Sequence, residues 1–119
     1  EAIQFYQDAI FLYPGYFLSH FNLGVTYQQQ GLFEKALNAY KAALKINAYH
    51  PETHLNLGSI YLALYKQDLA ILEYQEALRL NPELADAHYN LGVVYEAMGR
   101  VELAVPHYRE AERLGKGDK

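Results

Sequence analysis

The chain has no cysteine, no tryptophan and a single methionine among its 119 residues. Without cysteine it has no disulfide framework and no thiolate chemistry. No apolar run is longer than a few residues, so the sequence predicts no membrane-spanning helix, and nothing resembles a signal peptide. We therefore expect no membrane insertion and a cytoplasmic location; a periplasmic location fits the same absences.

Basic charge is also scarce. Ten lysines and arginines stand against 14 aspartates and glutamates, which gives a formal net charge of -4 and a pI near 5.7. The basic stripe that neutralises phosphates in nucleic-acid-binding proteins is missing, so we expect no nucleic-acid partner. Tyrosine is abundant, with 12 copies. A tyrosine packs through its ring and keeps a polar tip, which suits half-buried positions and binding surfaces.

The patterns that carry catalysis are missing as well. The chain has only two serines and two threonines, and Ser19 is merely a sequence neighbour of His20. The segment Gly115-Lys116-Gly117 lacks the spacing of a phosphate-binding loop. We therefore expect no catalytic residue and no enzymatic activity.

Five histidines raise the question of a metal site. His20, His54 and His88 are evenly spaced and far apart in the sequence, too far for one shared ion with bonds of about 2 Å. His50 and His54 have a helical metal-ligand spacing, but Pro51 lies between them, and we expect His50 outside the helix. We interpret these histidines as packing residues and expect neither a metal nor a cofactor.

What the chain has is an internal repeat. HFNLGVTY at 20–27 returns as HLNLGSIY at 54–61 and as HYNLGVVY at 88–95. Each copy begins 34 residues after the previous one, and further alanines and tyrosines align when the sequence is shifted by the same 34 residues. The repeat predicts a second half-unit at 1–16, full units at 17–50 and 51–84, and a terminal unit at 85–119 that ends in a short polar tail.

Within each unit the apolar residues recur every three or four positions, as on one face of a helix. Gly31 and Gly99 mark helix ends, and Tyr65 at the matching position must accept a positive φ or close its turn differently. Asn81 is expected as a left-handed cap, and Pro106 predicts a kink or a late start in the last helix. The predicted helices are 1–13, 17–30, 33–46, 52–64, 67–80, 85–98 and 101–114.

Small residues sit where the two helices of a unit must cross. Gly24, Ala36 and Ala43 remove side chains at the crossing, so that a tyrosine of the partner helix can fill the gap. A pair of helices cannot bury both of its faces alone, so the units are expected to stack around one continuous core.

The two ends differ from the middle of the array. Glu112 stands where the earlier units have Leu44 and Leu78, which is typical of a terminal repeat. We interpret the C-terminus as close to a natural end and the N-terminus as cut. Aromatic residues of 1–16 are expected to lose cover on one side, which would favour self-association; they are Phe5, Phe11, Tyr13 and Tyr16.

The pattern resembles the tetratricopeptide repeat, which reads W-x2-L-G-x2-Y, A-x3-F, A and P over a period of about 34 residues. The matching letters of the middle unit are Leu57, Gly58, Tyr61, Ala70, Tyr74, Ala77 and Pro82, and the other units repeat most of them. Histidine replaces the tryptophan, and tyrosine replaces the phenylalanine. The resemblance implies an all-α fold, a right-handed solenoid of about seven helices in antiparallel pairs.

The family resemblance also implies a concave groove, lined by the first helix of each unit, that binds peptides or protein segments. The groove residues expected on that ground are Phe21, Val25, Gln28, Leu55, Asn56, Ser59, Leu62, Tyr89, Asn90, Val93 and Glu96. The asparagines either face solvent and neighbouring turns or hold the backbone of a bound peptide, since an amide both donates and accepts hydrogen bonds.

The best-known ligand site of the family is a clamp of Lys, Asn and Arg for the C-terminal carboxylates of chaperones. Here the clamp positions hold Phe21, Val25, Asn56, Asp86 and Asn90, of which only Asn56 matches. We therefore expect no such clamp. An apolar groove with acidic neighbours favours an apolar segment that carries some basic residues.

The sequence thus favours a non-catalytic module for protein–protein interaction, with a scaffold or adaptor role. Two alternatives remain open at this point. One is a homo-oligomeric assembly scaffold, and the other is the recruiting arm of a larger enzyme or chaperone. The repeat specifies a shape, and a shape alone does not specify the partner.

Overall fold

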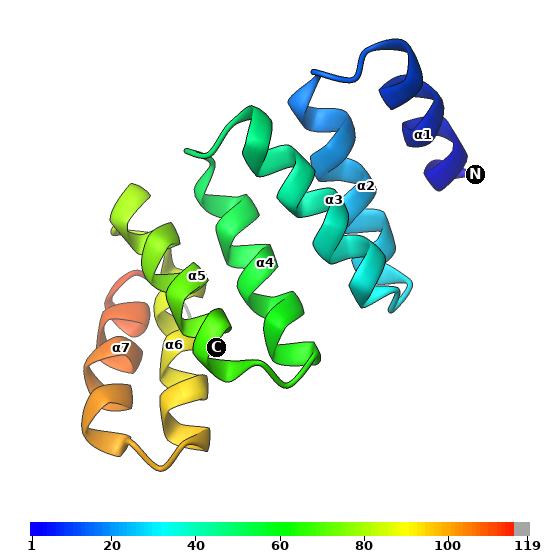
Figure 1. Ribbon diagram of the computed structural model, residues 1–119. Coiled ribbons are helices and arrows are strands. Elements are labelled where there is room, and N and C mark those ends of the chain that lie inside the picture. The colour runs from blue at the N-terminus through cyan, green and yellow to red at the C-terminus, as the bar shows by residue number, and fades with distance from the viewer. Residues whose placement is uncertain (116–119) are drawn as a thin grey trace.

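The computed structural model describes residues 1–115, which form seven helices and no strand (Figure 1). Every helix begins and ends within one residue of its predicted bounds. The helices are α1 (Ala2–Leu12), α2 (Phe17–Gln29), α3 (Phe33–Ile46), α4 (Pro51–Ala63), α5 (Gln67–Leu80), α6 (Ala85–Ala97) and α7 (Val101–Arg113). The polar tail expected after residue 115 lies outside the described residues.

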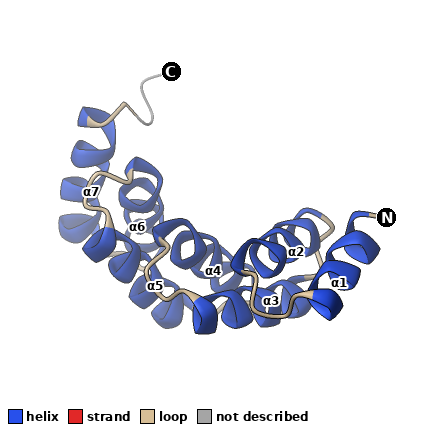
Figure 2. Cartoon of the chain, turned by 90° about the horizontal axis from the view of Figure 1, so that it is seen from above, coloured by secondary structure: helices blue, strands red, loops and turns tan. Residues whose placement is uncertain are grey.

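The helices stack in chain order. The closest packing is within the hairpins α2–α3, α4–α5 and α6–α7, and each hairpin also contacts the next through α3–α4 and α5–α6. Figure 2 shows the resulting arc, with α2, α4 and α6 toward its inner side and α3, α5 and α7 toward its outer side. The molecule measures 48 × 26 × 25 Å, as expected of an open stack rather than a sphere. The predicted all-α solenoid is confirmed.

One glycine and one tyrosine define the crossing of the two helices in each hairpin. A Cβ built on Gly24 would lie 2.7 Å from the Tyr40 ring, and the same holds at 2.8 Å for Gly58 and Tyr74. At Gly92 the distance to the Tyr108 ring is 2.7 Å. Real Cβ atoms do not approach this closely, so the tyrosine occupies the space that the missing side chain leaves. The sequence prediction for these glycines is confirmed.

The turn inside each hairpin is the same at all three positions. In the first, the Leu32 N–H donates to the Tyr27 carbonyl at 2.9 Å, and the Gly31 N–H donates to the Gln28 carbonyl at 3.0 Å. This is the Schellman arrangement, which needs a left-handed residue after the helix. Gly31 and Gly99 supply it with φ of 76° and 78°, and Tyr65 adopts φ of 61°. Tyr65 therefore accepts the positive φ, the first of its two predicted alternatives.

One prediction about a helix end is wrong. Asn81 is no left-handed cap: its backbone is extended, with φ of -144°, and its side-chain oxygen accepts a hydrogen bond from the Glu83 N–H at 3.1 Å. An asparagine in such a turn bends the chain with its side chain rather than with a positive φ. Of the two alternatives predicted for Pro106, the late start does not occur, because α7 begins at Val101 and continues through the proline; the kink stays a prediction.

The first helix is the least covered. α1 packs mainly against α2 and has no fully buried residue. Its aromatic residues and those of the following turn are exposed as predicted: Phe5 by 67%, Phe11 by 85%, Tyr13 by 70% and Tyr16 by 57%.

The contact between glycine and tyrosine gives the first testable prediction. Alanine normally stabilises a helix interior relative to glycine by about 1 kcal/mol. At Gly58 we expect alanine to lower the free energy of unfolding instead. The added methyl group meets the fully buried ring of Tyr74, and overpacking costs about 1–3 kcal/mol. Urea unfolding of Gly58→Ala measures the difference.

Gly15→Ala is the matched control. Nothing lies within 4 Å of a Cβ at Gly15, and its φ is not positive, so this change should leave the free energy of unfolding nearly unchanged. If Gly58→Ala proves as stable as the wild type, the tyrosine ring does not depend on the missing side chain.

Candidate interaction surface

The eleven groove residues expected from the sequence all lie on α2, α4 and α6, and none of them is buried. We call this set the inner face. Tyr89, Val93 and Glu96 of α6 are exposed, and the other eight are half-buried. Apolar members of the set, such as Phe21 and Leu55, also pack against the core, so the surface they offer is held by the core beneath it.

The tyrosine of each outer helix reaches polar groups of the inner face. The Tyr40 hydroxyl donates to Gln28 Oε1 at 2.7 Å, and the Tyr108 hydroxyl donates to Glu96 Oε1 at 2.7 Å. In the middle hairpin the Tyr74 hydroxyl lies 2.9 Å from Ser59 Oγ. The rings that fill the helix crossings thus also orient side chains on the inner face, which sequence reasoning missed.

Two of the three asparagines connect successive hairpins. The Asn56 side chain hydrogen-bonds the Tyr40 hydroxyl of the preceding hairpin, and Asn90 does the same with Tyr74. Because the Tyr40 proton is already donated to Gln28, the Asn56 amide NH₂ is the donor to the Tyr40 oxygen. Neither sequence alternative for the asparagines named this contact. The sequence contains only one sign of this contact: the tyrosine precedes the asparagine by the same number of residues in both pairs.

These tyrosines are protonated at neutral pH. Burial raises the pKa of Tyr40 to about 12, and the hydrogen bond from Asn56 acts against that rise. Burial also raises the pKa of Tyr74, whereas for Tyr108 burial and the Glu96 carboxylate together raise the pKa to about 12. The Tyr40 and Tyr108 hydroxyls therefore remain donors to the inner face.

Aromatic rings gather at the α2 end. The Phe17 and Phe21 rings stack at 6.0 Å between centroids, and the His50 ring meets them edge-on at 4.9 and 5.0 Å. His50 also caps α4, since its Nδ1 accepts a hydrogen bond from the Thr53 N–H at 3.2 Å. At the other end the Tyr89 ring is T-shaped to the Tyr108 ring at 5.7 Å.

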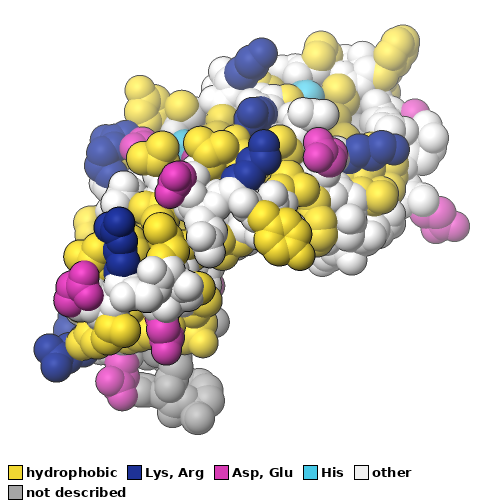
Figure 3. Space-filling model, turned by 60° about the horizontal axis from the view of Figure 1, so that its bottom comes forward, with side chains coloured by type: hydrophobic (Ala, Val, Ile, Leu, Met, Phe, Trp, Pro, Cys, Tyr) yellow, Lys and Arg dark blue, Asp and Glu magenta, His cyan; other side chains and the backbone are white. Residues whose placement is uncertain are grey.

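The charges of the inner helices have one sign. α2 has no charged residue, α4 has Glu52, and α6 has Asp86 and Glu96. No lysine or arginine lies on any of these three helices. Figure 3 shows the arch from below the view of Figure 1, where acidic and basic side chains alternate with hydrophobic ones. The restriction to acidic charge is therefore a property of the inner helices and not of the whole surface.

The histidines of the repeat hold the loops between hairpins. Nε2 of His20, His54 and His88 lies 2.8–2.9 Å from the carbonyl oxygen six residues earlier, on Pro14, Ala48 and Pro82 respectively. A carbonyl only accepts, so Nε2 carries the proton in each ring. This repeated bond is what the sequence reading of these residues as packing variants had missed.

The other ring nitrogen meets a different residue in each hairpin. His54 Nδ1 lies 2.8 Å from Glu73 Oε1, and this hydrogen bond is the main reason that the pKa of His54 is raised. His88 Nδ1 lies 3.1 Å from His107 Nδ1, so the neutral pair requires His107 to donate. Burial, and secondarily the His88 charge, lower the pKa of His107. The middle hairpin thus favours a protonated histidine and the last hairpin a neutral one.

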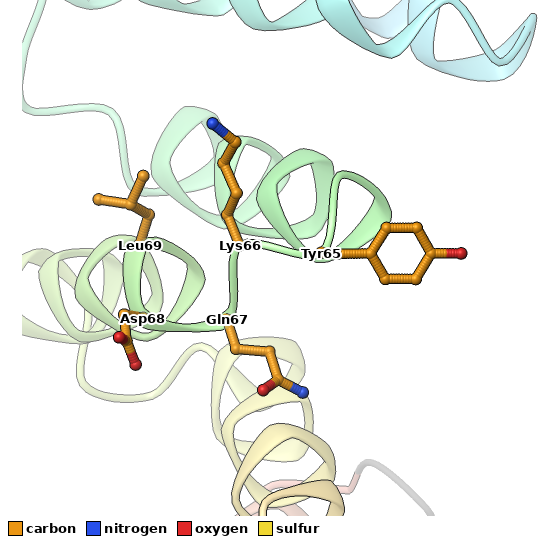
Figure 4. A pocket seen from close by; sticks show the side chains of 5 residues that line it. All are labelled: Tyr65, Lys66, Gln67, Asp68 and Leu69. Carbon is orange, nitrogen blue, oxygen red and sulfur yellow. The ribbon is translucent and has the colours of Figure 1, made fainter.

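Hollows elsewhere on the surface lack the features of a chemical site. A hollow of about 450 Å³ at the α4–α5 turn is lined by Tyr65, Lys66, Gln67, Asp68 and Leu69. Figure 4 shows these side chains pointing away from one another. A second hollow of about 460 Å³ lies among α1, α2 and α3.

Residues 1–115 contain neither a cluster of metal ligands nor a membrane-spanning helix. Nowhere in that range do three histidine, aspartate or glutamate side chains lie together as metal ligands would. Nor does any helix there combine the length and the apolar character that crossing a membrane requires.

Known sequence families and structures match this architecture. A family model described as "Tetratricopeptide repeat" matches residues 17–50 and 85–115, and one described as "TPR repeat" matches residues 60–99. No curated protein sequence matches the chain.

Solved structures resemble the whole chain. A crystal structure of MamA is 29% identical with a TM-score of 0.90, over 95% of this chain and 66% of that one. A second MamA structure has 29% identity and a TM-score of 0.88, over 94% and 61%. The first TPR of Spaghetti (RPAP3), bound to the HSP90 peptide SRMEEVD, has 25% identity and a TM-score of 0.80, over 83% and 79%. The chain thus spans less than two thirds of either MamA chain.

The pairing of His54 with Glu73 predicts a pH-dependent stability. Because the folded state raises the His54 pKa above about 6.5, the pair stabilises the protein below that pH, and the contribution is lost as the pH rises through the folded-state pKa. We expect Glu73→Gln to lower the free energy of unfolding by about 1 kcal/mol at pH 5.5 to 6, and by much less at pH 8.5. Urea unfolding across this range measures it.

The contribution of His107 to stability depends on pH in the opposite direction. Its pKa is lowered, so stability is lost as the pH falls through the value of the unfolded chain. Wild type and Glu73→Gln both contain His107, so its contribution cancels in the difference between them. A difference that stays constant from pH 5.5 to 8.5 would contradict a protonated His54.

Proposed function

Because the chain belongs to the tetratricopeptide repeat family, we propose that it is a non-catalytic protein-interaction module whose inner face binds a segment of another protein. The observation that carries the proposal is the inner face itself. It combines partly exposed apolar side chains with amide, hydroxyl and carboxylate groups that tyrosines already orient. Apolar surface with a few fixed polar groups is what a peptide needs for affinity and register.

We assign the repeat units to residues 17–50, 51–84 and 85–119, preceded by a half-unit at 1–16. A module of this kind acts as a scaffold or adaptor, either alone or as the recruiting arm of a larger protein. The two MamA chains are longer than this one, which spans 66% and 61% of them.

The ligand that best fits the inner face is apolar with some basic residues. The RPAP3 repeat was solved with the peptide SRMEEVD, whose C-terminal half is acidic. Here the inner helices bear Glu52, Asp86 and Glu96 and no basic residue, so they repel such a peptide. Basic side chains flanked by leucine-like anchors complement both the charge and the apolar surface.

Val93→Arg tests whether the inner face binds. Val93 is 39% exposed on α6, so a longer side chain there extends outward and obstructs the surface without disturbing the core. We expect at least a tenfold loss of affinity for peptides selected on the wild-type protein from a random peptide library. Isothermal titration calorimetry measures the affinity, and the thermal midpoint should not change.

Leu72→Arg is the matched control, because Leu72 is 60% exposed on α5, away from the inner face. Its affinity should equal that of the wild type. Equal loss in both variants, or loss in neither, would place the binding surface elsewhere.

Self-association is the second candidate, and the exposed aromatic surface of α1 and the turn after it favours it. Phe11 and Tyr13 are exposed by 85% and 70%. Exposed apolar patches of this kind commonly mark interfaces. The occupant would be a second copy of the chain, in keeping with a homo-oligomeric assembly scaffold.

Sedimentation velocity from micromolar to millimolar concentration tests this candidate. If it holds, the mass rises with concentration, and replacing Phe11 and Tyr13 by serine abolishes the rise because both side chains lie in the patch. A wild-type chain that stays monomeric throughout eliminates the candidate for these residues.

A further inference from the structure

We propose that the inner face fixes the orientation of its ligand: apolar side chains of the bound segment lie against α2 and α4, and a lysine or arginine lies over α6. This inference rests on the proposed function. It adds to it the statement that the two ends of the surface recognise different chemistry. The basis is a gradient of charge and exposure along the arc.

The α2 end offers apolar surface without an anion. Neither α2 nor the described contacts of Phe21 include a carboxylate; the Phe21 ring instead meets Phe17, Tyr40 and His50 within 6.0 Å. Behind it α3 carries three lysines and one glutamate, namely Lys35, Lys41, Lys45 and Glu34. A cationic side chain is therefore repelled at this end, whereas a leucine-like or aromatic side chain gains contact area.

The α6 end offers an anion beside an aromatic ring. Tyr89, Val93 and Glu96 follow one another at helical spacing on one side of α6, and they are the exposed members of the inner face. Glu96 Oε1 accepts the Tyr108 hydroxyl, which holds the carboxylate in place. That hydrogen bond uses Oε1 and not the second oxygen of the carboxylate, Oε2. That oxygen is the acceptor for an ammonium or guanidinium group.

The surroundings of α6 strengthen the preference for a cation. α6 and α7 together carry five acidic residues and two basic ones: Asp86, Glu96, Glu102, Glu110 and Glu112 against Arg109 and Arg113. The Tyr89 ring adds an aromatic face to the stripe formed by Tyr89, Val93 and Glu96. A guanidinium can stack on this ring while it pairs with Glu96. The net charge of the whole hairpin, inner and outer helix together, therefore changes sign from α2–α3 to α6–α7.

The orientation is measured with a nitroxide-labelled peptide. The probe is a dodecapeptide with four leucines in one half and four arginines in the other, synthesised in both chain directions, with the spin label at either end. Amide resonances of the ¹⁵N-labelled protein report the position of the label. We expect a label at the leucine end to broaden α2, including Asn22, and a label at the arginine end to broaden α6, including Asn90.

Each outcome decides between the inference and its premise. Binding shifts on the inner face with equal broadening of α2 and α6 from either label, or with the reverse pattern, overturn the orientation and leave the proposed function standing. No shift on the inner face at millimolar peptide overturns both. Broadening in the expected pattern for both chain directions supports an orientation set by side-chain chemistry rather than by the peptide backbone.

Glu96→Gln isolates the charge. Glutamine keeps an acceptor oxygen for Tyr108, so the geometry of the stripe survives while the anion is lost. We expect a two- to fivefold weaker affinity for the arginine-containing probe, the size typical of an exposed ion pair, and no change for a probe with glutamines in place of the arginines.

Glu102→Gln removes the same charge from the outer helix of the same hairpin. It should leave both affinities unchanged. Equal weakening by Glu102→Gln and Glu96→Gln would show that only the overall charge of the hairpin attracts the ligand, and would overturn the assigned site at Glu96.

Discussion

The contact of a tyrosine ring with a glycine backbone is the constraint on which the rest of the molecule depends. Each hairpin closes because a ring occupies the space of an absent Cβ, within 2.7–2.8 Å of where that atom would lie. Alanines such as Ala36 and Ala70, which are fully buried, allow the second helix to approach. Three repetitions of the same crossing give three similar hairpins, and similar hairpins stack into a regular arc (Figure 2).

The same tyrosine rings connect the core to the inner face. Tyr40 and Tyr108 each end in a hydroxyl that donates to a residue of the inner face, and Tyr40 also accepts from Asn56 of the next hairpin. One side chain thus fixes a helix crossing, orients a surface group and ties two repeats together. Any change at such a tyrosine would alter packing and surface chemistry at once, so the two are not separable there.

Most of the fold could be predicted from the sequence because an internal repeat constrains every copy. Gly24, Gly58 and Gly92 identified the crossings, and the helical spacing gave bounds within one residue. What the sequence predicted wrongly or missed depended on side-chain hydrogen bonds that no spacing rule specifies. Asn81 turns the chain with its amide oxygen, and His54 is held by the Ala48 carbonyl and the Glu73 carboxylate. For the inner face, the sequence predicted a set of residue positions. It did not predict the hydrogen bonds from the tyrosine hydroxyls that orient some of these residues.

Tyr65 has a consequence for the motions of the molecule. Its turn has the same hydrogen bonds as those at Gly31 and Gly99, but it holds a bulky L-residue at φ of 61°. Such a residue is higher in energy by about 1 kcal/mol, which multiplies the population of locally opened states about fivefold. The α4–α5 turn should therefore show faster hydrogen exchange and proteolysis than the equivalent turns at Gly31 and Gly99, although it lies in the middle of the chain.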